Sequence, residues 1–244
     1  YLYHMIKNAH RSGYVSVIGN PNVGKSTLVN ALMGRDLSIT TAKAQTTRHR
    51  ILGFINGEDY QLILSDTPGI IKPAYEMQNS MMDFVKESLD DADVLIYMID
   101  VAERNIKDER LLEKIQKSKT PLLVLINKID TSAQKELEEA VQHWAGIFPD
   151  SSVIPISALK RFFIPDLLEI LISKIPESPP YFPKDQLSDK PERFFVNEAI
   201  RKNILENYDK EIPYAVEVVT EEFMEAEKII KIRSIILVER ETQK

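Results

Sequence analysis

A short segment near the N-terminus has the residue types and spacing of a phosphate-binding loop. Residues 19–26 read Gly-Asn-Pro-Asn-Val-Gly-Lys-Ser, which fits the pattern G-x-x-x-x-G-K-S, and they stand between an expected strand and an expected helix. Backbone N–H groups of residues 22–27 can then cradle phosphate oxygens at the helix N-terminus. Lys25 can bridge the β- and γ-phosphates, and the Ser26 hydroxyl can ligate Mg²⁺. The segment predicts a nucleotide site built from Gly19, Asn20, Pro21, Asn22, Val23, Gly24, Lys25, Ser26 and Thr27.

A second polar segment, Asp66-Thr67-Pro68-Gly69, follows directly on an apolar run. A carboxylate at the carboxyl end of a strand can hold Mg²⁺ through water, and the Gly69 N–H can bind a γ-phosphate, so this turn would respond to hydrolysis. Pro-Gly marks many ordinary turns, so the segment gains its meaning from following the phosphate loop. We predict a Mg²⁺ site that includes Ser26 and Asp66.

The third segment, Asn127-Lys128-Ile-Asp130, indicates which base is bound. A carboxylate at Asp130 can accept hydrogen bonds from N1–H and the exocyclic amine of guanine, whereas adenine offers neither donor there. The Lys128 stem can stack along the base, and Asn127 can contact the base or tie neighbouring loops together. Downstream, Ser157-Ala158-Leu159 can place the Ala158 N–H on the guanine O6. These residues predict a guanine nucleotide.

The elements that must position these residues alternate strand and helix. Apolar runs predict strands at residues 14–19, 51–55, 60–65, 94–100, 121–126 and 153–156, and helical patterns cover residues 26–33, 77–89, 109–117, 134–148 and 164–174. This alternation predicts an α/β fold with a mostly parallel sheet and helices on both faces. The Asn56-Gly57 pair predicts one antiparallel hairpin, because both residues tolerate positive φ.

Proline divides the chain. We expect an N-terminal extension at residues 1–11, of which His4-Met5 reads as a tag junction, and a nucleotide-binding domain at 12–175. Five prolines within residues 175–191 predict a semi-rigid linker at 176–191. Residues 192–244 predict a small α+β unit, with a helix over 194–207 and strands over 214–222 and 229–241.

Composition excludes several classes of protein. The 244 residues contain no cysteine, so disulfides, thiol nucleophiles and cysteine-ligated zinc are excluded, and a reducing compartment and a cytoplasmic protein are expected. The four histidines form no metal-ligand pattern. No apolar run approaches the ~20 residues of a membrane span. The formal charge of −6 argues against a broad nucleic-acid surface, although it can conceal a local basic patch.

The three nucleotide motifs and Ser157-Ala-Leu, in this order, resemble those of translation-factor-related P-loop GTPases. The Q-T-T-R-H-R sequence at 45–50, Met81-Met-Asp-Phe, the proline-rich stretch, and residues 194–201 and 238–244 resemble the Era-like GTPase family. The resemblance implies GTP hydrolysis to GDP with Mg²⁺, and a C-terminal RNA-binding domain of the KH type. It implies small-subunit rRNA and the small ribosomal subunit as partners. The resemblance also suggests peripheral association with a membrane.

The resemblance also assigns residues 40–50 to switch I, a loop that senses the γ-phosphate. There we choose Thr47 to bind Mg²⁺ and the γ-phosphate through its hydroxyl and N–H, with Thr46 as the alternative that spacing does not separate. Gly69 is followed by Ile70, which cannot orient water as a glutamine does. Similar GTPases with asparagine at the position of Asn22 use K⁺ there, so we predict Lys25, Thr47, Gly69 and Asn22 as the catalytic set. A backbone cap is the alternative role for Asn22, and Arg48, His49 and Arg50 are weaker candidates for hydrolysis.

The C-terminal unit departs from the family pattern. A KH domain clamps nucleic acid with a G-x-x-G loop, and no such sequence follows Lys184, where the chain carries 11 Lys and Arg against 14 Asp and Glu. We therefore expect a partial, apparently truncated KH-like domain with weakened RNA binding. Two alternatives stay open: a nucleotide-gated RNA scaffold with negligible turnover, and a P-loop kinase, which Asn127-Lys-Ile-Asp130 disfavours.

Overall fold

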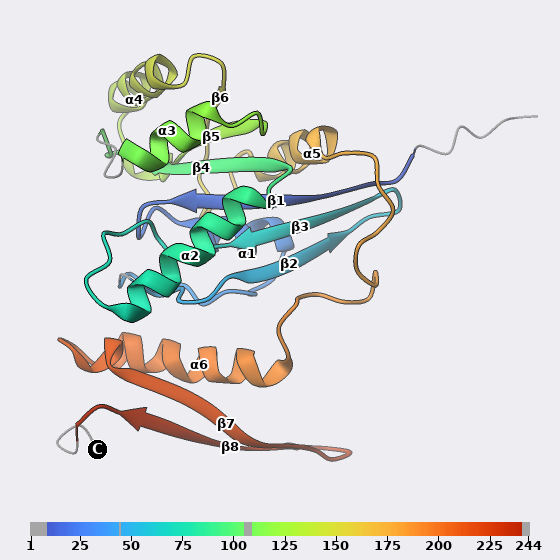
Figure 1. The fold of residues 1–244 in the computed structure, drawn as a ribbon, viewed down its shortest axis with the longest axis vertical. Coiled ribbons are helices and arrows are strands. Elements are labelled where there is room, and N and C mark those ends of the chain that lie inside the picture. Colours follow the sequence, from blue (N-terminus) through green and yellow to red (C-terminus); the bar gives the residue numbers. More distant parts are fainter. Residues whose placement is uncertain (1–8, 44, 105–108, 241–244) are drawn as a thin grey trace, which may run out of the picture.

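The computed structural model describes residues 9–43, 45–104 and 109–240, and within them it contains one six-stranded sheet (Figure 1). The strand order is β2-β3-β1-β4-β5-β6, and only the β2–β3 pair is antiparallel. The predicted α/β class with a mostly parallel sheet is confirmed. The strands are β1 (Arg11–Gly19), β2 (Ile51–Asn56), β3 (Tyr60–Asp66), β4 (Val94–Asp100), β5 (Leu122–Asn127) and β6 (Ser152–Pro155).

Helices cover both faces of this sheet, as predicted, because successive strand residues alternate between two cores. In β4, for example, Ile96 belongs to the core beneath α1 and α5, whereas Tyr97 belongs to the core beneath α2, α3 and α4. All six strands end in loops that connect to these helices or to the hairpin. The helices are α1 (Lys25–Met33), α2 (Glu76–Asp90), α3 (Glu109–Lys117), α4 (Gln134–Ile147) and α5 (Ile164–Lys174).

The hairpin between β2 and β3 forms, but its turn differs from the prediction. Gly57 N–H donates to the Tyr60 carbonyl at 2.9 Å, so the tight turn spans residues 57–60, and neither Asn56 nor Gly57 takes a positive φ. A Cβ at Gly57 would lie 2.1 Å from the Tyr60 ring. The glycine is needed here for the close approach of an aromatic ring rather than for positive φ.

The proline-rich segment runs along the β2 edge of the sheet instead of spanning free space (Figure 1). Phe54 N–H donates to the Leu187 carbonyl at 3.0 Å, and the Ser188 hydroxyl donates to the Leu52 carbonyl at 2.7 Å. The Phe182 ring stacks on Phe54 with centroids 4.2 Å apart. This edge strand is therefore covered by the segment that leads to the C-terminal unit.

The C-terminal unit consists of α6 (Glu192–Asn207), a short 3₁₀ helix η2 (Ile212–Tyr214), β7 (Val216–Glu225) and β8 (Ile230–Val238). β7 and β8 form an antiparallel two-stranded sheet, and α6 lies between this sheet and the nucleotide-binding domain (Figure 1). Its buried apolar core is small, with Ile204, Val216 and Val218 at its centre. The unit fits the small α+β domain that the sequence predicts.

β1 begins one residue before the expected domain boundary at residue 12. Arg11 starts β1, and its guanidinium donates to the carbonyls of Ser173 and Ile175 at the end of α5. Residues 1–8 of the expected extension and residues 241–244 of the C-terminal motif lie outside the described residues. Among the helices in the described part of the chain, none has the length and apolarity needed to cross a bilayer.

Candidate nucleotide-binding site

The phosphate loop joins β1 to the N-terminus of α1. Its path requires left-handed backbone at Asn22 (φ 64°) and Gly24 (φ 102°). A Cβ at Gly24 would lie 2.4 Å from Asn127 Nδ2, so only glycine fits without movement of the neighbouring loop. The Asn127 amide in turn donates to the Val23 carbonyl at 2.8 Å. The predicted phosphate loop and the predicted base-recognition loop are thus packed directly on each other.

Lys25 is buried, and its ammonium group is held by the loop. Nζ donates to the carbonyls of Gly19 at 3.1 Å and Asn20 at 2.9 Å. Burial lowers the pKa of Lys25 to about 8, although the carboxylates of Asp66 and Glu103 act in the opposite direction. This charge is poorly solvated, and phosphate oxygens would be stronger partners for it than neutral carbonyls.

Asp66 is fully buried at the end of β3, and neither of its carboxylate oxygens makes a hydrogen bond of good geometry among the described residues, although the hydroxyls of Ser26 and Ser38 lie near it. Burial raises the pKa of this carboxyl, and the hydroxyls of Ser38 and Ser26 and the Lys25 ammonium oppose the rise. A buried carboxylate without a partner is costly unless a cation or water completes it. The donor set of one carboxylate with nearby hydroxyls suits a hard cation such as Mg²⁺.

Switch I brings one predicted threonine to the phosphate loop. Thr47 Oγ1 lies 2.9 Å from Ser26 Oγ. The Thr46 hydroxyl instead donates to the Lys43 carbonyl at 2.6 Å and lies 2.7 Å from Thr41 Oγ1, so it is engaged within the loop itself. The geometry favours Thr47 over Thr46 as the residue that shares a ligand with Ser26.

The Asp66–Gly69 turn lies against the phosphate loop. The buried Thr67 hydroxyl donates to the Val17 carbonyl at 2.7 Å, and a Cβ at Gly69 would lie 2.7 Å from Pro21 Cα. Ile70 N–H donates to the Gly19 carbonyl at 3.0 Å, and its side chain is buried in the core beneath α2. Ile70 therefore serves packing, as its apolar side chain implies.

On the base side, Asn127 is buried and ties three loops together. Besides donating to Val23, Asn127 accepts the Ala158 N–H through its side-chain oxygen at 2.9 Å. The Ala158 N–H, which the sequence predicts to contact the guanine O6, therefore has a partner within the protein. Asp130 is exposed, and its carboxylate accepts the Ser157 hydroxyl at 2.6 Å, which orients it. Lys128 pairs with Asp100 at 2.7 Å.

A cavity of about 450 Å³ lies between these segments. It is lined by Pro21, Asn22, Gly24, Lys25, Ser26, Thr27, Ile39, Thr40, Thr41, Ala42, Gln45, Thr46, Thr47, Thr67, Gly69 and Lys128. The other predicted site residues are not among those that line it: Gly19, Asn20, Val23, Asp66, Pro68, Asn127, Asp130, Ser157, Ala158 and the exposed Leu159. The cavity thus corresponds to the phosphate end of the predicted site, and the base-recognition loops adjoin it at Lys128.

Three basic residues of switch I face away from this cavity. Arg48 donates to carbonyls of the C-terminal unit, and Arg50 pairs with Asp91 at 2.6 Å. The His49 ring packs between Phe84 and Phe194. None of the three touches the phosphate loop in the described contacts. Arg48 and His49 contact the C-terminal unit, whereas Arg50 bonds to Ser65 and Asp91 within the nucleotide-binding domain.

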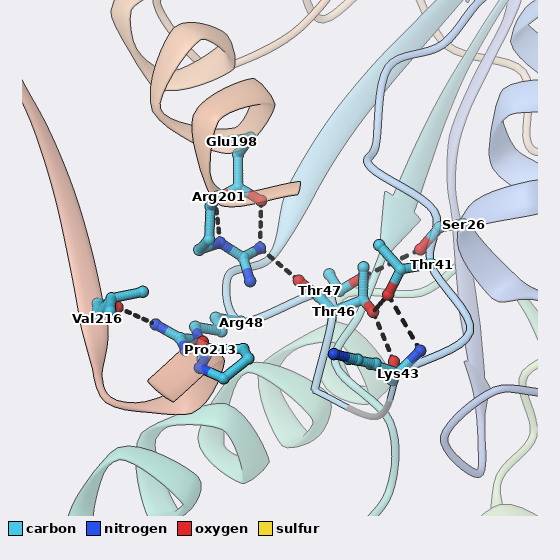
Figure 2. Close-up of polar contacts among 10 residues, drawn as sticks. All are labelled: Ser26, Thr41, Lys43, Thr46, Thr47, Arg48, Glu198, Arg201, Pro213 and Val216. Carbon is cyan, nitrogen blue, oxygen red and sulfur yellow. Dashed lines mark hydrogen bonds and ion pairs between the residues drawn. The ribbon is translucent and has the colours of Figure 1, made fainter. Parts of the chain in front are cut away.

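Contacts from the C-terminal unit to switch I were missed by reasoning from sequence. Arg201 donates to the Thr46 carbonyl, one residue from Thr47 (Figure 2). The only sequence signal is Glu198, which stands one helical turn before Arg201 and allows an ion pair. That pair does not reveal which loop the arginine will reach.

Comparisons with known proteins agree with this arrangement. A family model described as 50S ribosome-binding GTPase matches residues 14–128. The chain is similar to Era in complex with MgGDPNP and nucleotides 1506–1542 of 16S ribosomal RNA, with 34% identity over 96% of this chain and 80% of that chain and a TM-score of 0.89. It is similar to an Era variant from Aquifex aeolicus bound to GDP·AlF4⁻, with 35% identity over 95% and 80% of the two chains and a TM-score of 0.89. With elongation factor SelB from Methanococcus maripaludis, in complex with the GTP analogue GppNHp, it shares the fold alone, at 18% identity over 86% of this chain and 41% of that chain and a TM-score of 0.54.

Proposed function

This chain belongs to the Era family of GTP-hydrolysing P-loop proteins, and we propose that it is a nucleotide-dependent switch that acts in assembly of the small ribosomal subunit by binding small-subunit rRNA. The observation that carries the nucleotide-switch part of the proposal is the convergence of the phosphate loop, the Asp66–Gly69 turn and switch I on one cavity, with Asn127 joining them to the base side.

The reaction is an in-line attack of water on the γ-phosphate of GTP, which breaks the bond to the β–γ bridging oxygen and yields GDP and phosphate. Lys25 would neutralise charge that develops on the bridging oxygen. Thr47 and Gly69 would bind the γ-phosphate from two sides. Its departure would remove their shared partner, so switch I and the Asp66–Gly69 turn would relax together. Asp130 would select guanine.

Mg²⁺ fits the residues present. The buried Asp66 and the adjacent hydroxyls of Ser26 and Thr47 would hold it, Asp66 through water. When bound, the ion supplies positive charge that offsets the phosphate oxygens.

We further propose that K⁺ assists hydrolysis beside Asn22, because Ile70 cannot orient water. In support, Asn22 lines the phosphate cavity, and its amide nitrogen donates to the Ala42 carbonyl of switch I at 3.1 Å, which leaves the side-chain oxygen as a free ligand candidate. Turnover should be at least tenfold faster in KCl than in matched NaCl, and the Asn22→Ala variant should lose this difference. Equal rates in both salts, or a K⁺ effect that survives the substitution, would remove Asn22 from the mechanism.

The RNA partner is proposed from the relative that was solved with 16S ribosomal RNA, whose likeness extends over 96% of this chain and therefore over the C-terminal unit. The family model described as 50S-binding spans residues 14–128 only and says nothing of that unit. We propose residues 12–175 as the GTPase domain, 176–191 as the linker and 192–244 as the KH-like part, working in the cytoplasm. Peripheral membrane association is not part of this proposal.

The test is release of phosphate under multiple-turnover conditions, together with fluorescence anisotropy of an oligonucleotide from the 3′ end of small-subunit rRNA at a stated salt concentration. Sustained release of phosphate into water and saturable RNA binding are expected. A single turnover followed by arrest would favour the scaffold alternative, phosphate transferred to an acceptor would favour a kinase, and RNA binding no tighter than to a scrambled oligonucleotide would contradict the rRNA proposal.

A further inference from the structure

The C-terminal unit holds switch I at three places along residues 43–48. The Lys43 ammonium pairs with Asp209 at 3.1 Å and donates to the Tyr208 carbonyl, just after α6. Arg201 of α6 donates to the Thr46 carbonyl. The Arg201 contact at Thr46 and the bonds made by Arg48 lie on either side of Thr47 in the sequence, and Figure 2 shows both.

Arg201 is the most deeply buried member of this set. Its side chain is 4% exposed and is paired with Glu198, with Nε 2.8 Å from Oε1 and Nη2 in contact with Oε2. This two-point pair fixes the plane of the guanidinium. The same Nη2 also donates to the Thr46 carbonyl, so the arginine that α6 orients is attached to the switch backbone.

Arg48 makes the reciprocal contact from the other side. Its guanidinium donates to the carbonyls of Pro213 at 3.1 Å, Tyr214 at 3.1 Å and Val216 at 2.9 Å, where η2 passes into β7. The side chain is buried, and burial lowers its pKa, although an arginine stays charged. Switch I is therefore held on both sides of Thr47 by charge-assisted hydrogen bonds.

The geometry matters because the Thr46 carbonyl and the Thr47 N–H belong to one planar peptide unit. A donor fixed on that carbonyl also fixes the direction of the N–H on the opposite side of the unit. The Thr47 hydroxyl is already beside Ser26 at 2.9 Å. The N–H that would meet the γ-phosphate thus takes its orientation from a helix of the C-terminal unit.

We propose that Arg201 and Arg48 are positioning residues for GTP hydrolysis: they hold the Thr46–Thr47 peptide and the Thr47 hydroxyl where the γ-phosphate and Mg²⁺ bind. The inference rests on the proposed role of Thr47. Nucleotide contacts that do not involve the γ-phosphate, such as that of Asp130 with the base, are independent of this hold. Loss of the hold should therefore weaken the binding and hydrolysis of GTP and leave the binding of GDP unchanged.

The test compares variants that remove the hold with one that does not. Arg201→Ala would leave Glu198 buried without a partner, so the double variant Glu198→Leu/Arg201→Met is also made, because apolar residues of similar volume can replace a buried ion pair without loss of stability. Lys202→Ala, on the exposed side of the same helix, is the matched control. Arg201→Lys retains one donor for the Thr46 carbonyl.

We expect the double variant and Arg48→Met to lower kcat for GTP at least tenfold and to raise the Mg²⁺ concentration needed for half-maximal turnover. Affinity for a non-hydrolysable GTP analogue should fall, whereas affinity for GDP should stay within twofold of the parent. Arg201→Lys should recover part of the loss, and Lys202→Ala should behave as the parent.

A double variant that melts at the parent's temperature and keeps the parent's kcat would overturn the inference. Equal losses in GDP and GTP-analogue affinity would also overturn it, because they would indicate general damage to the fold. If the parent binds both nucleotides but hydrolyses none, the proposed function fails, and the difference between analogue and GDP affinity still decides the inference.

Discussion

At the scale of the residue, the site is defined by two buried charged side chains. Lys25 shares its ammonium between two loop carbonyls, and Asp66 makes no hydrogen bond of good geometry among the described residues. Both arrangements are costly in a protein interior. A magnesium nucleotide would relieve both costs at once, because its phosphates suit the ammonium and its cation suits the carboxylate.

The pKa of Lys25 leads to a pH dependence with a definite sign. The free protein loses this proton at about pH 8, below the ordinary 10.5, because burial disfavours the charged form. Bound phosphates should restore the ammonium form of Lys25. Between these two pH values, GDP binding should therefore take up a proton, and GDP affinity should fall by up to tenfold for each pH unit. Titration calorimetry at pH 9 in two buffers of different ionisation enthalpy measures the uptake.

Two comparisons control the Lys25 experiment. No uptake from this residue is expected at pH 6.5, where the ammonium is already formed, and none is expected from Lys25→Arg at pH 9, because a guanidinium keeps its proton. The same proton uptake at pH 9 in the arginine variant would assign the titration to another group.

At the scale of the element, a run of prolines predicts a linker, but it does not predict what the linker touches. Gln61 of β3 is fully buried and binds this segment. Its side-chain oxygen accepts the N–H groups of Tyr181 at 2.7 Å and Phe182 at 2.9 Å, and its amide donates to the Phe182 carbonyl at 2.8 Å. One glutamine thus fixes the path of the chain toward the C-terminal unit.

Gln61→Ala should therefore destabilise the protein. Two N–H groups and one carbonyl of the segment would lose their partner, and each buried group left unpaired costs about 1–3 kcal/mol. We expect a loss of at least ~2 kcal/mol in the free energy of unfolding, measured by urea denaturation. Gln134→Ala on the exposed surface of α4 is the control, and a loss in the glutamine-61 variant no larger than in this control would contradict the account.

Much of the fold could be predicted from the sequence because its signals are local. The helices 109–117 and 164–174 match α3 and α5 residue for residue, since their apolar spacing and the Pro165 near the start of α5 mark them within one segment. The nucleotide motifs are equally local. By contrast, the turn at Gly57 is set by the packing of the Tyr60 ring, and the hold of Arg201 on Thr46 joins residues far apart in the chain. Rules based on the spacing of neighbouring residues do not predict a contact of this kind.

At the scale of the whole molecule, the two units depend on each other. The C-terminal unit has a small apolar core of its own, and many side chains of β8 are exposed. Its attachment to the GTPase domain relies on the proline-rich segment and on the switch I contacts. Because Arg48 bonds three backbone carbonyls within residues 213–216, the position of the C-terminal unit and the conformation of switch I are linked, and the linkage acts in both directions.

This linkage predicts that the distance between the units reports the state of switch I. The chain has no cysteine, so one cysteine at Lys135 on α4 and one at Glu221 on β7 can be labelled without background. Arg48→Met should broaden the distance distribution measured by energy transfer between the labels. Lys43→Met, which removes only the more exposed contact, should change it less, and identical distributions in both variants and the parent would contradict the linkage.

The central claim is that this chain is a guanine-nucleotide enzyme, and base selection by Asp130 tests it most directly. Its carboxylate, oriented by Ser157, would accept both donors of guanine, whereas an amide in Asp130→Asn would offer one donor that suits the second carbonyl of xanthine. Equilibrium affinities and turnover should be measured for GTP and XTP with both proteins. The account predicts that the substitution weakens GTP at least tenfold, consistent with about 1–3 kcal/mol for a mismatched polar site, and strengthens XTP until it becomes the preferred substrate. Unchanged GTP affinity in the variant would contradict it.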